Sequence, residues 1–377
     1  MFEKEKYLFL KKIIKNENAI DELLAYTENK FIKKKNNFSI QEGLFINVWE
    51  DYYQESKKIG VFETLKKYIV QLQFPIQKGI SKTEDYINTT LKGKQKVSKL
   101  VLKLNHPNAI KLDIYKSDLS GRIPVLIVSN NEDFNTIVCA LSNKNEPLEL
   151  PKSIGASFIN GINNWDRIKR LKANWLKQNP LGNWSLYFKE YIVPKPYLFK
   201  DKLMILSTKA YSGIKSESLR VSKKTWKFSS LIIRREHECA HLFTLKYYGC
   251  IANNMHDEII ADYTGITKVL GQFSKEWFLH FVGLENYPLY RKGGRLENYQ
   301  GKNKLSKEAF EGLKWIIKNV SDTIYKFDNE LGKIKSSVDY LNRIKSICEV
   351  DLITMASIRG NQKLMEKYNS KKVVAVL

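Results

Sequence analysis

Several features that would place the chain in a familiar class are missing from its sequence. No run of about 18 apolar residues occurs, so no membrane-spanning helix is expected. The first residues, MFEKEKYLFLKK, interrupt each apolar stretch with charge and do not predict a secretion signal. Four cysteines form no CxxC pair, which argues against a disulfide framework or a cysteine metal site. These absences favour a cytoplasmic protein without a membrane partner.

Arginine is also scarce in a chain whose formal net charge is +23. Only ten of the 63 basic residues are arginine, and the lysines are spread along the chain without a dominant block. Arginine is the side chain suited to bidentate contacts with phosphates and base edges. We therefore expect a lysine-rich solvated surface and no specific nucleic-acid partner.

The length of 377 residues is sufficient for two lobes. Helical periodicity dominates residues 1–95, and short strand-like runs follow at 101–104, 112–115 and 123–129. Residues 142–166 are rich in turn-forming residues and predict a loop. The pattern predicts a helix-dominated α+β fold, with a small sheet in the N-terminal half and a helical C-terminal half. We place the boundary between a lobe at 1–165 and a lobe at 166–377.

Two successive helices in the second lobe have clear end signals. Ser222 is a suitable N-cap for a long helix over 223–248, and Gly249 suits the left-handed residue that ends it. A second helix is expected to start after Asn254 and to end at Gly271. The turn at Gly249 is expected to bring the second helix back against the first.

The first of these helices contains an HExxH motif, His237-Glu238-Cys239-Ala240-His241. Residues four apart share one face of a helix, so both imidazoles can bind a single metal ion. Glu238 lies beside them and can act as the general base that activates a water on the metal. The motif predicts a zinc site in the helical C-terminal half of the chain.

The second helix offers the third ligand that a catalytic zinc site requires. Its segment HDEIIAD places Glu258 and Asp262 four residues apart, so both carboxylates lie on one face. We predict that Glu258 binds the metal. Asp262 is expected to accept the outer N–H of one histidine and to fix its orientation.

Together these residues resemble the gluzincin superfamily of zinc metallopeptidases, in which HExxH is followed by ExxxD on a later helix. The resemblance covers His237 to Asp262, with sixteen residues between His241 and Glu258, slightly fewer than in the best-known members. It implies amide hydrolysis that depends on zinc. The metzincin pattern does not fit, because Thr244 and Tyr247 stand where that pattern needs glycine and histidine.

Three further residues are candidates for substrate binding. Arg295 follows Gly293-Gly294 and could hold a substrate carboxylate in a bidentate pair. Asn164 could line the cleft with its amide. His256, in the first turn of the second helix, is a rival third ligand or a transition-state donor. A turn residue paired with an acid, a turn-forming asparagine and a polar residue at a helix start are the respective structural alternatives.

The function expected from these patterns is a metallopeptidase-like hydrolase that cleaves an amide bond in a peptide or peptide-like small molecule. Two alternatives stay open: a biosynthetic tailoring hydrolase that acts on a modified metabolite, and a regulatory HExxH protein that contacts DNA. Histidine and carboxylate ligands also admit manganese, iron or cobalt. The sequence does not predict an oligomeric state.

Overall fold

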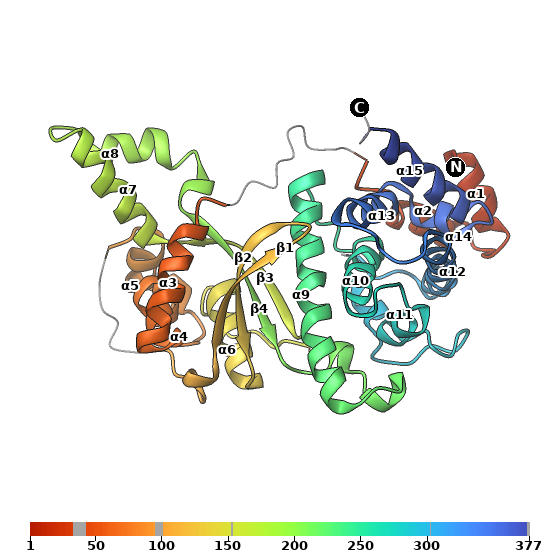
Figure 1. Ribbon diagram of the computed structural model, residues 1–377, viewed down its shortest axis with the longest axis horizontal. Coiled ribbons are helices and arrows are strands. Elements are labelled where there is room, and N and C mark those ends of the chain that lie inside the picture. The colour runs from red at the N-terminus through yellow and green to blue at the C-terminus, as the bar shows by residue number, and fades with distance from the viewer. Residues whose placement is uncertain (33–42, 95–100, 152–153, 302, 375–377) are drawn as a thin grey trace. The chain divides into compact units, whose positions relative to one another are not determined.

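The computed structural model describes residues 1–32, 43–94, 101–151, 154–301 and 303–374, which form two compact units (Figure 1). Unit 1 comprises Met1–Ser39, Asp118–Ser120 and Ala210–Leu377, and unit 2 comprises Ile40–Ser117 and Gly121–Lys209. This division differs from the predicted boundary between residues 165 and 166. The reason is tertiary: a strand beyond residue 166 completes the sheet of unit 2, and the first two helices of the chain belong to unit 1.

Unit 2 holds a four-stranded sheet with the order β1-β2-β4-β3. Strands β1 and β2 pair antiparallel, β2 and β4 pair parallel, and β3 and β4 pair antiparallel, so the sheet is mixed. This small sheet, together with the helices of both units, confirms the predicted helix-dominated α+β fold. The strands are β1 (Lys111–Ser117), β2 (Gly121–Val128), β3 (Ala156–Asn163) and β4 (Lys200–Ser207).

Two local predictions about strands were wrong. Residues 101–104 form no strand in the structure, and β3 lies inside the segment 142–166 that was expected to be a loop. The β3 segment contains Asn160, Gly161 and Asn163, and asparagine and glycine are depleted in strands. Pairing with β4 overrides this local preference, and the register shifts between Asn160 and Ile162.

Helices pack against this sheet within unit 2, with α3 beside β1 and β2, and α6 beside β2, β3 and β4. The helix α7 begins directly after β3 and leads into the short α8. The helices of unit 2 are α3 (Ile46–Ile59), α4 (Val61–Tyr68), α5 (Glu84–Tyr86), α6 (Asn131–Ser142), α7 (Trp165–Gln178) and α8 (Trp184–Tyr187), with a π-helical turn η5 (Phe188–Ile192) after α8.

Unit 1 is built from helices around one apolar core. The N-terminal segment contributes two helices, α1 and α2, to this unit. No helix among the described residues is both long enough and apolar enough to cross a bilayer. The helices of unit 1 are α1 (Glu3–Lys11), α2 (Glu17–Tyr26), α9 (Lys223–Tyr248), α10 (Met255–Leu270), α11 (Lys275–Val282), α12 (Lys307–Leu331), α13 (Ser337–Glu349), α14 (Leu352–Ala356) and α15 (Gly360–Val374).

The ends of α9 and α10 agree with the signals in the sequence. The Ser222 side chain accepts a hydrogen bond from the Thr225 amide at the start of α9, and Gly249 ends that helix with φ of 81°. Asn254 caps α10 by accepting from two backbone amides of its first turn. The helices then pack very closely, because a Cβ on Gly265 would lie 2.8 Å from the Ile233 carbonyl oxygen.

A buried ion-pair group holds α10 against the C-terminal helices. The Tyr263 hydroxyl of α10 donates to Asp328 Oδ1 over 2.6 Å. Arg343, which is fully buried, donates to the same oxygen over 2.9 Å and also pairs with Asp339 at 3.0 Å. Pairing of this kind offsets much of the cost of removing the charges from water. Helix α10 is therefore held by its packing on α9 and by this group, which joins it to α12 and α13.

Candidate metal centre

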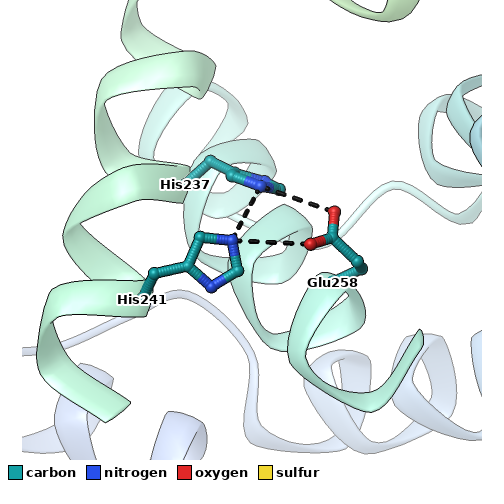
Figure 2. A group of neighbouring side chains, drawn as sticks. All are labelled: His237, His241 and Glu258. Carbon is teal, nitrogen blue, oxygen red and sulfur yellow. Dashed lines mark hydrogen bonds and ion pairs between the residues drawn. The ribbon is translucent and has the colours of Figure 1, made fainter. Parts of the chain in front are cut away.

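The two histidines of the HExxH motif meet on the face of α9 that packs against α10. His237 and His241 are both buried, and their Nε2 atoms lie 3.1 Å apart. Glu258 in the first turns of α10 places Oε2 at 3.5 Å from His237 Nε2 and Oε1 at 3.5 Å from His241 Nε2. Figure 2 shows the imidazoles and the carboxylate converging from the two neighbouring helices. The group could hold a metal ion.

These separations can be compared with the size of a zinc ion. Zinc binds histidine nitrogen and carboxylate oxygen at about 2.0–2.2 Å, and in a tetrahedral site this places neighbouring ligand atoms roughly 3.3–3.5 Å apart. The separations between the three candidate ligands are 3.1, 3.5 and 3.5 Å. The residues present therefore fit an ion of this size with little movement.

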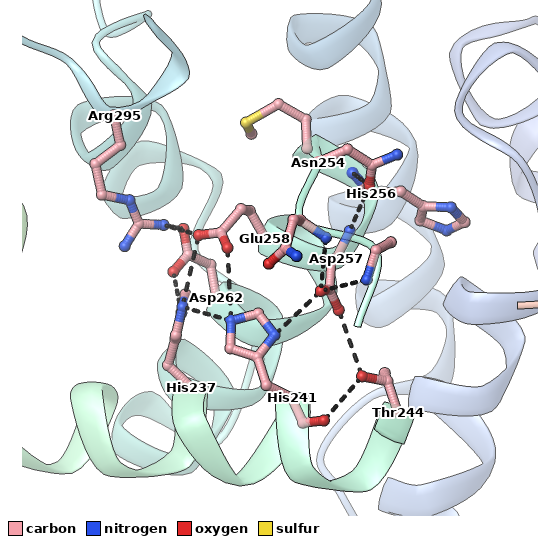
Figure 3. Close-up of polar contacts among 12 residues, drawn as sticks. His237, His241, Thr244, Asn254, His256, Asp257, Glu258, Asp262 and Arg295 are labelled. Carbon is pink, nitrogen blue, oxygen red and sulfur yellow. Dashed lines mark hydrogen bonds and ion pairs between the residues drawn. The ribbon is translucent and has the colours of Figure 1, made fainter. Parts of the chain in front are cut away.

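The outer nitrogen of His237 faces a polar group that fixes its proton (Figure 3). His237 Nδ1 lies 3.1 Å from Asp262 Oδ1 and 2.9 Å from the Tyr211 hydroxyl. Tyr211 donates its one proton to Asp262 Oδ1 over 2.6 Å. The Tyr211 oxygen and Asp262 Oδ1 can therefore only accept a hydrogen bond from His237. The His237 proton is therefore on Nδ1, and the lone pair of Nε2 points at the candidate metal position.

His241 has a matching partner on α10. Its Nδ1 lies 3.3 Å from Asp257 Oδ2, and the same carboxylate oxygen accepts from the Ala252 and Asn253 amides. With its proton on Nδ1, His241 also turns the lone pair of Nε2 toward the candidate metal position. Two neutral imidazoles would then oppose lone pairs across 3.1 Å, and either a metal ion between them or a proton shared by the two Nε2 atoms would relieve this repulsion.

The charges buried around the site are mostly negative. Four carboxylates around the candidate ligands are at least nine-tenths buried, and two arginines are equally buried beside them. A fifth buried carboxylate, Glu236 on α9, pairs with Arg235. The buried carboxylates around the candidate ligands thus outnumber the buried guanidinium groups, which favours a positive charge at the position where the ligands converge. The carboxylates belong to Glu238, Asp257, Glu258 and Asp262, and the guanidinium groups to Arg234 and Arg295.

The charges around the site also shift the pKa values of Asp262 and His241. Burial by itself raises the pKa of a carboxyl, yet Arg295 and His237 lower the pKa of Asp262 to about 2. Burial by itself lowers the pKa of an imidazole, yet the Asp257 and Glu258 carboxylates raise the pKa of His241 well above its ordinary value. The arrangement thus stabilises positive charge at the position where the ligands converge.

Arg295 lies inside this network rather than on an open surface. Its guanidinium donates to Asp262 Oδ2 and to the Tyr211 hydroxyl, and Nη2 lies 3.5 Å from Glu258 Oε2. The arginine thus spans the third ligand and the partner of His237. Its Nε is buried without a hydrogen-bond partner in the described residues, so one donor is left for a further group.

Glu238 is also buried, with 8% of its surface exposed. Its carboxylate has no hydrogen bond and no ion pair among the residues that the structure describes. Arg234, one turn earlier on α9, interacts with it electrostatically. A buried carboxylate that is not committed to a partner is available to accept a proton.

Two of the residues predicted to bind substrate or metal have other roles. His256 points away from the cluster (Figure 3), and its Nε2 donates to the Ile347 carbonyl oxygen over 2.9 Å. His256 is therefore not a third ligand. Its position at the start of α10 directs its side chain toward α13. Asn164 is fully buried in unit 2, where its amide nitrogen donates to Asp201 over 2.7 Å and its oxygen caps α7. Its amide is used to hold the fold together.

The whole cluster lies inside one region of family similarity. The model of DUF7005, a family of unknown function, matches residues 8–359. The chain belongs to this family. No curated protein and no solved structure matches the chain.

Two residues of the site in this DUF7005 member, Asp257 and Tyr211, were not predicted from the sequence. Asp257 lies directly before Glu258, and this place in the sequence could have suggested a role beside the second histidine. Tyr211 lies 26 residues before His237 in a short turn, η7 (Tyr211–Gly213), and is one of twenty tyrosines. No local pattern distinguishes it from the others.

The role of Asp257 can be tested by a change to asparagine. Asp257→Asn should weaken zinc binding by about 10–100-fold, because the outer partner of a metal-binding histidine fixes its tautomer and raises its basicity. Competition with a chromophoric chelator measures this affinity. Asp339→Asn, a buried aspartate paired with Arg343 elsewhere in unit 1, is the matched control and should bind zinc normally. Equal affinities in the two variants would contradict the assigned role.

Proposed function

We propose that this chain is a zinc-dependent hydrolase that cleaves an amide bond in a peptide or peptide-like substrate. The observation that carries the proposal is the convergence of His237 Nε2, His241 Nε2 and the Glu258 carboxylate within 3.1–3.5 Å of their neighbours. Two imidazole nitrogens and one carboxylate oxygen form the ligand set of several catalytic zinc sites, which keep a further position open. Manganese, iron and cobalt accept similar ligands and are the competing metals.

The metal and the protein have separate roles in such a reaction. When bound by two histidines and a glutamate, zinc lowers the pKa of water and polarises a substrate carbonyl. Glu238 is the group we assign as general base, which takes a proton from the attacking water and passes it to the leaving amine. Asp262 and Asp257 keep the lone pairs of His237 and His241 aimed at one point.

The order of the residues gives further support. HExxH on α9 and ExxxD on α10 resemble the gluzincin pattern, and the two helices are joined by a short turn. In the family pattern the glutamate of ExxxD binds the metal, and here Glu258 occupies that place. The resemblance favours amide hydrolysis over other zinc chemistry. It does not extend to the rest of the chain.

Metal analysis combined with a cleavage assay tests the proposal. The purified full chain should contain close to one zinc ion per molecule and should cleave members of a mixed peptide library, as detected by mass spectrometry. Removal of the metal with a chelator should abolish cleavage, and added zinc should restore it.

The two parts of the proposal can fail separately. A chain that binds no divalent metal would overturn the site itself. A chain that binds one zinc ion but leaves all peptides intact would overturn the peptide assignment and favour a small modified metabolite as substrate.

A further inference from the structure

A two-helix arm in unit 2 has almost no core of its own. The arm, residues 169–195, contains the end of α7, the whole of α8 and the π-helical turn η5, and is drawn in yellow-green in Figure 1. No residue from 169 to 191 is buried. Surface helices normally bury one apolar face against the protein that carries them. The apolar residues of this arm are therefore available to something else.

The arm nevertheless has a defined shape. Trp175 stacks on Tyr187 with ring centroids 4.8 Å apart, and Tyr187 stacks on Tyr191 at 5.2 Å. A Cβ on Gly182 would lie only 2.2 Å from the Trp175 ring, so the turn between the two helices is packed closely against that ring. This turn leaves Leu181 completely exposed at the tip.

Aliphatic and basic side chains are exposed together on the arm. Leu181 is 102% exposed, Leu186 52% and Val193 47%, which is unusual for side chains of this size. Residues 169–195 also contain six basic residues and a single acidic one. Five of them are the lysines Lys169, Lys172, Lys177, Lys189 and Lys195, and the sixth, Arg170, forms ion pairs with Asp51 and Asp166.

This combination distinguishes between possible partners. A second copy of the chain would bring two strongly basic arms together, which is unfavourable. Single-stranded nucleic acid needs a row of open aromatic faces for base stacking, but Trp175 and Tyr187 stack on each other, and of the three stacked rings only Tyr191 is more than half exposed. A bilayer that contains anionic lipids suits exposed leucines, interfacial tryptophan and tyrosine, and lysines whose amines reach the headgroups.

We propose that the arm binds the surface of anionic lipid bilayers. The exposed aliphatic side chains at and near the tip enter the boundary between headgroups and acyl chains, and the lysines pair with lipid phosphates. A helix that lies in the interface need not span the membrane. The sequence predicted no membrane partner because it lacks a spanning segment, and the arm binds a membrane without one.

Flotation of the full chain with lipid vesicles tests this inference. The protein should float with vesicles of phosphatidylcholine and phosphatidylglycerol, but not with phosphatidylcholine alone, and salt should reduce the bound fraction. The double variant Leu181→Ser/Leu186→Ser should partition about tenfold more weakly or worse, because it removes two exposed apolar side chains. Lys177→Glu/Lys189→Glu should weaken binding to the anionic vesicles alone.

Matched controls distinguish specific binding by the arm from nonspecific hydrophobic adsorption and from misfolding of the variants. Ile358→Ser removes an equally exposed aliphatic side chain from unit 1 and should bind vesicles as the wild type does. Circular dichroism should give the same helical signal for every variant. Absence of flotation, or equal flotation of the leucine variant, would overturn the proposal. So would binding to a single-stranded oligonucleotide that outcompetes the vesicles, or a dimer that disappears in the leucine variant.

Discussion

Glu238→Gln is expected to retain one zinc ion per chain and to lower turnover by about 10²–10⁴-fold, the usual contribution of a general base. Glutamine has the same shape as glutamate but cannot accept a proton at neutral pH. The carboxylate of Glu238 has no hydrogen bond or ion pair among the described residues, so its replacement disturbs few contacts. Elemental analysis measures the zinc content, and initial rates on a peptide cleaved by the wild type measure turnover.

Glu236→Gln is the matched control for this variant. Glu236 is a buried glutamate on the same helix, paired with Arg235 at 3.3 Å, two residues before Glu238. It should keep both zinc and turnover. An active Glu238→Gln enzyme would remove Glu238 from the reaction while leaving the metal site intact. Loss of zinc in Glu238→Gln would instead make this glutamate part of the binding site.

Glu258→Ala should have the largest effect on the metal, with zinc affinity lowered by at least about 10³-fold, more than the 10–100-fold typical of an outer partner. The change removes the one anionic ligand and leaves two neutral imidazoles. It also leaves the Arg295 guanidinium, now 3.5 Å from Glu258 Oε2, with less negative charge around it. The repulsion between Arg295 and the cation would then no longer be offset by the Glu258 carboxylate. Elemental analysis after dialysis and chelator competition measure the loss.

His256→Asn provides the control for loss of a buried polar residue near the start of α10. His256 lies two residues before Glu258 but donates to Ile347, so its variant should keep one zinc ion per chain even if the fold is less stable. Thermal unfolding followed by circular dichroism reports that stability separately. Normal zinc binding by Glu258→Ala would exclude this glutamate as a ligand and, with it, the gluzincin-like arrangement.

The two variants test different steps of the proposal. Glu258→Ala addresses whether α9 and α10 form a metal site together, and Glu238→Gln addresses what that site does. Loss of zinc in the first and loss of turnover alone in the second would support a hydrolase. Loss of zinc in the first with no detectable substrate for any form would leave a metal site whose chemistry lies outside amide hydrolysis.

Local patterns in the sequence were sufficient for the two helices of the candidate site. Ser222, Gly249 and Asn254 are short-range end signals, and each depends on hydrogen bonds within a few residues of the chain. The i to i+4 spacing then places His237 beside His241 whatever the rest of the fold does. The helix-dominated α+β class also follows from local periodicity, because most helices here have an apolar face that repeats along the sequence.

Contacts between distant segments were decided only by the tertiary structure. Strand β3 exists because β4, some forty residues later, supplies its hydrogen bonds. Tyr211 and Arg295 reach Asp262 from segments 51 and 33 residues away, and neither segment has a repeating pattern that predicts its end point. The sequence alone determined which side chains lie on each helix face, since helix geometry is local. The packing of α10 on α9 determined which of those side chains meet, because that packing depends on shape complementarity such as the Gly265 contact with Ile233.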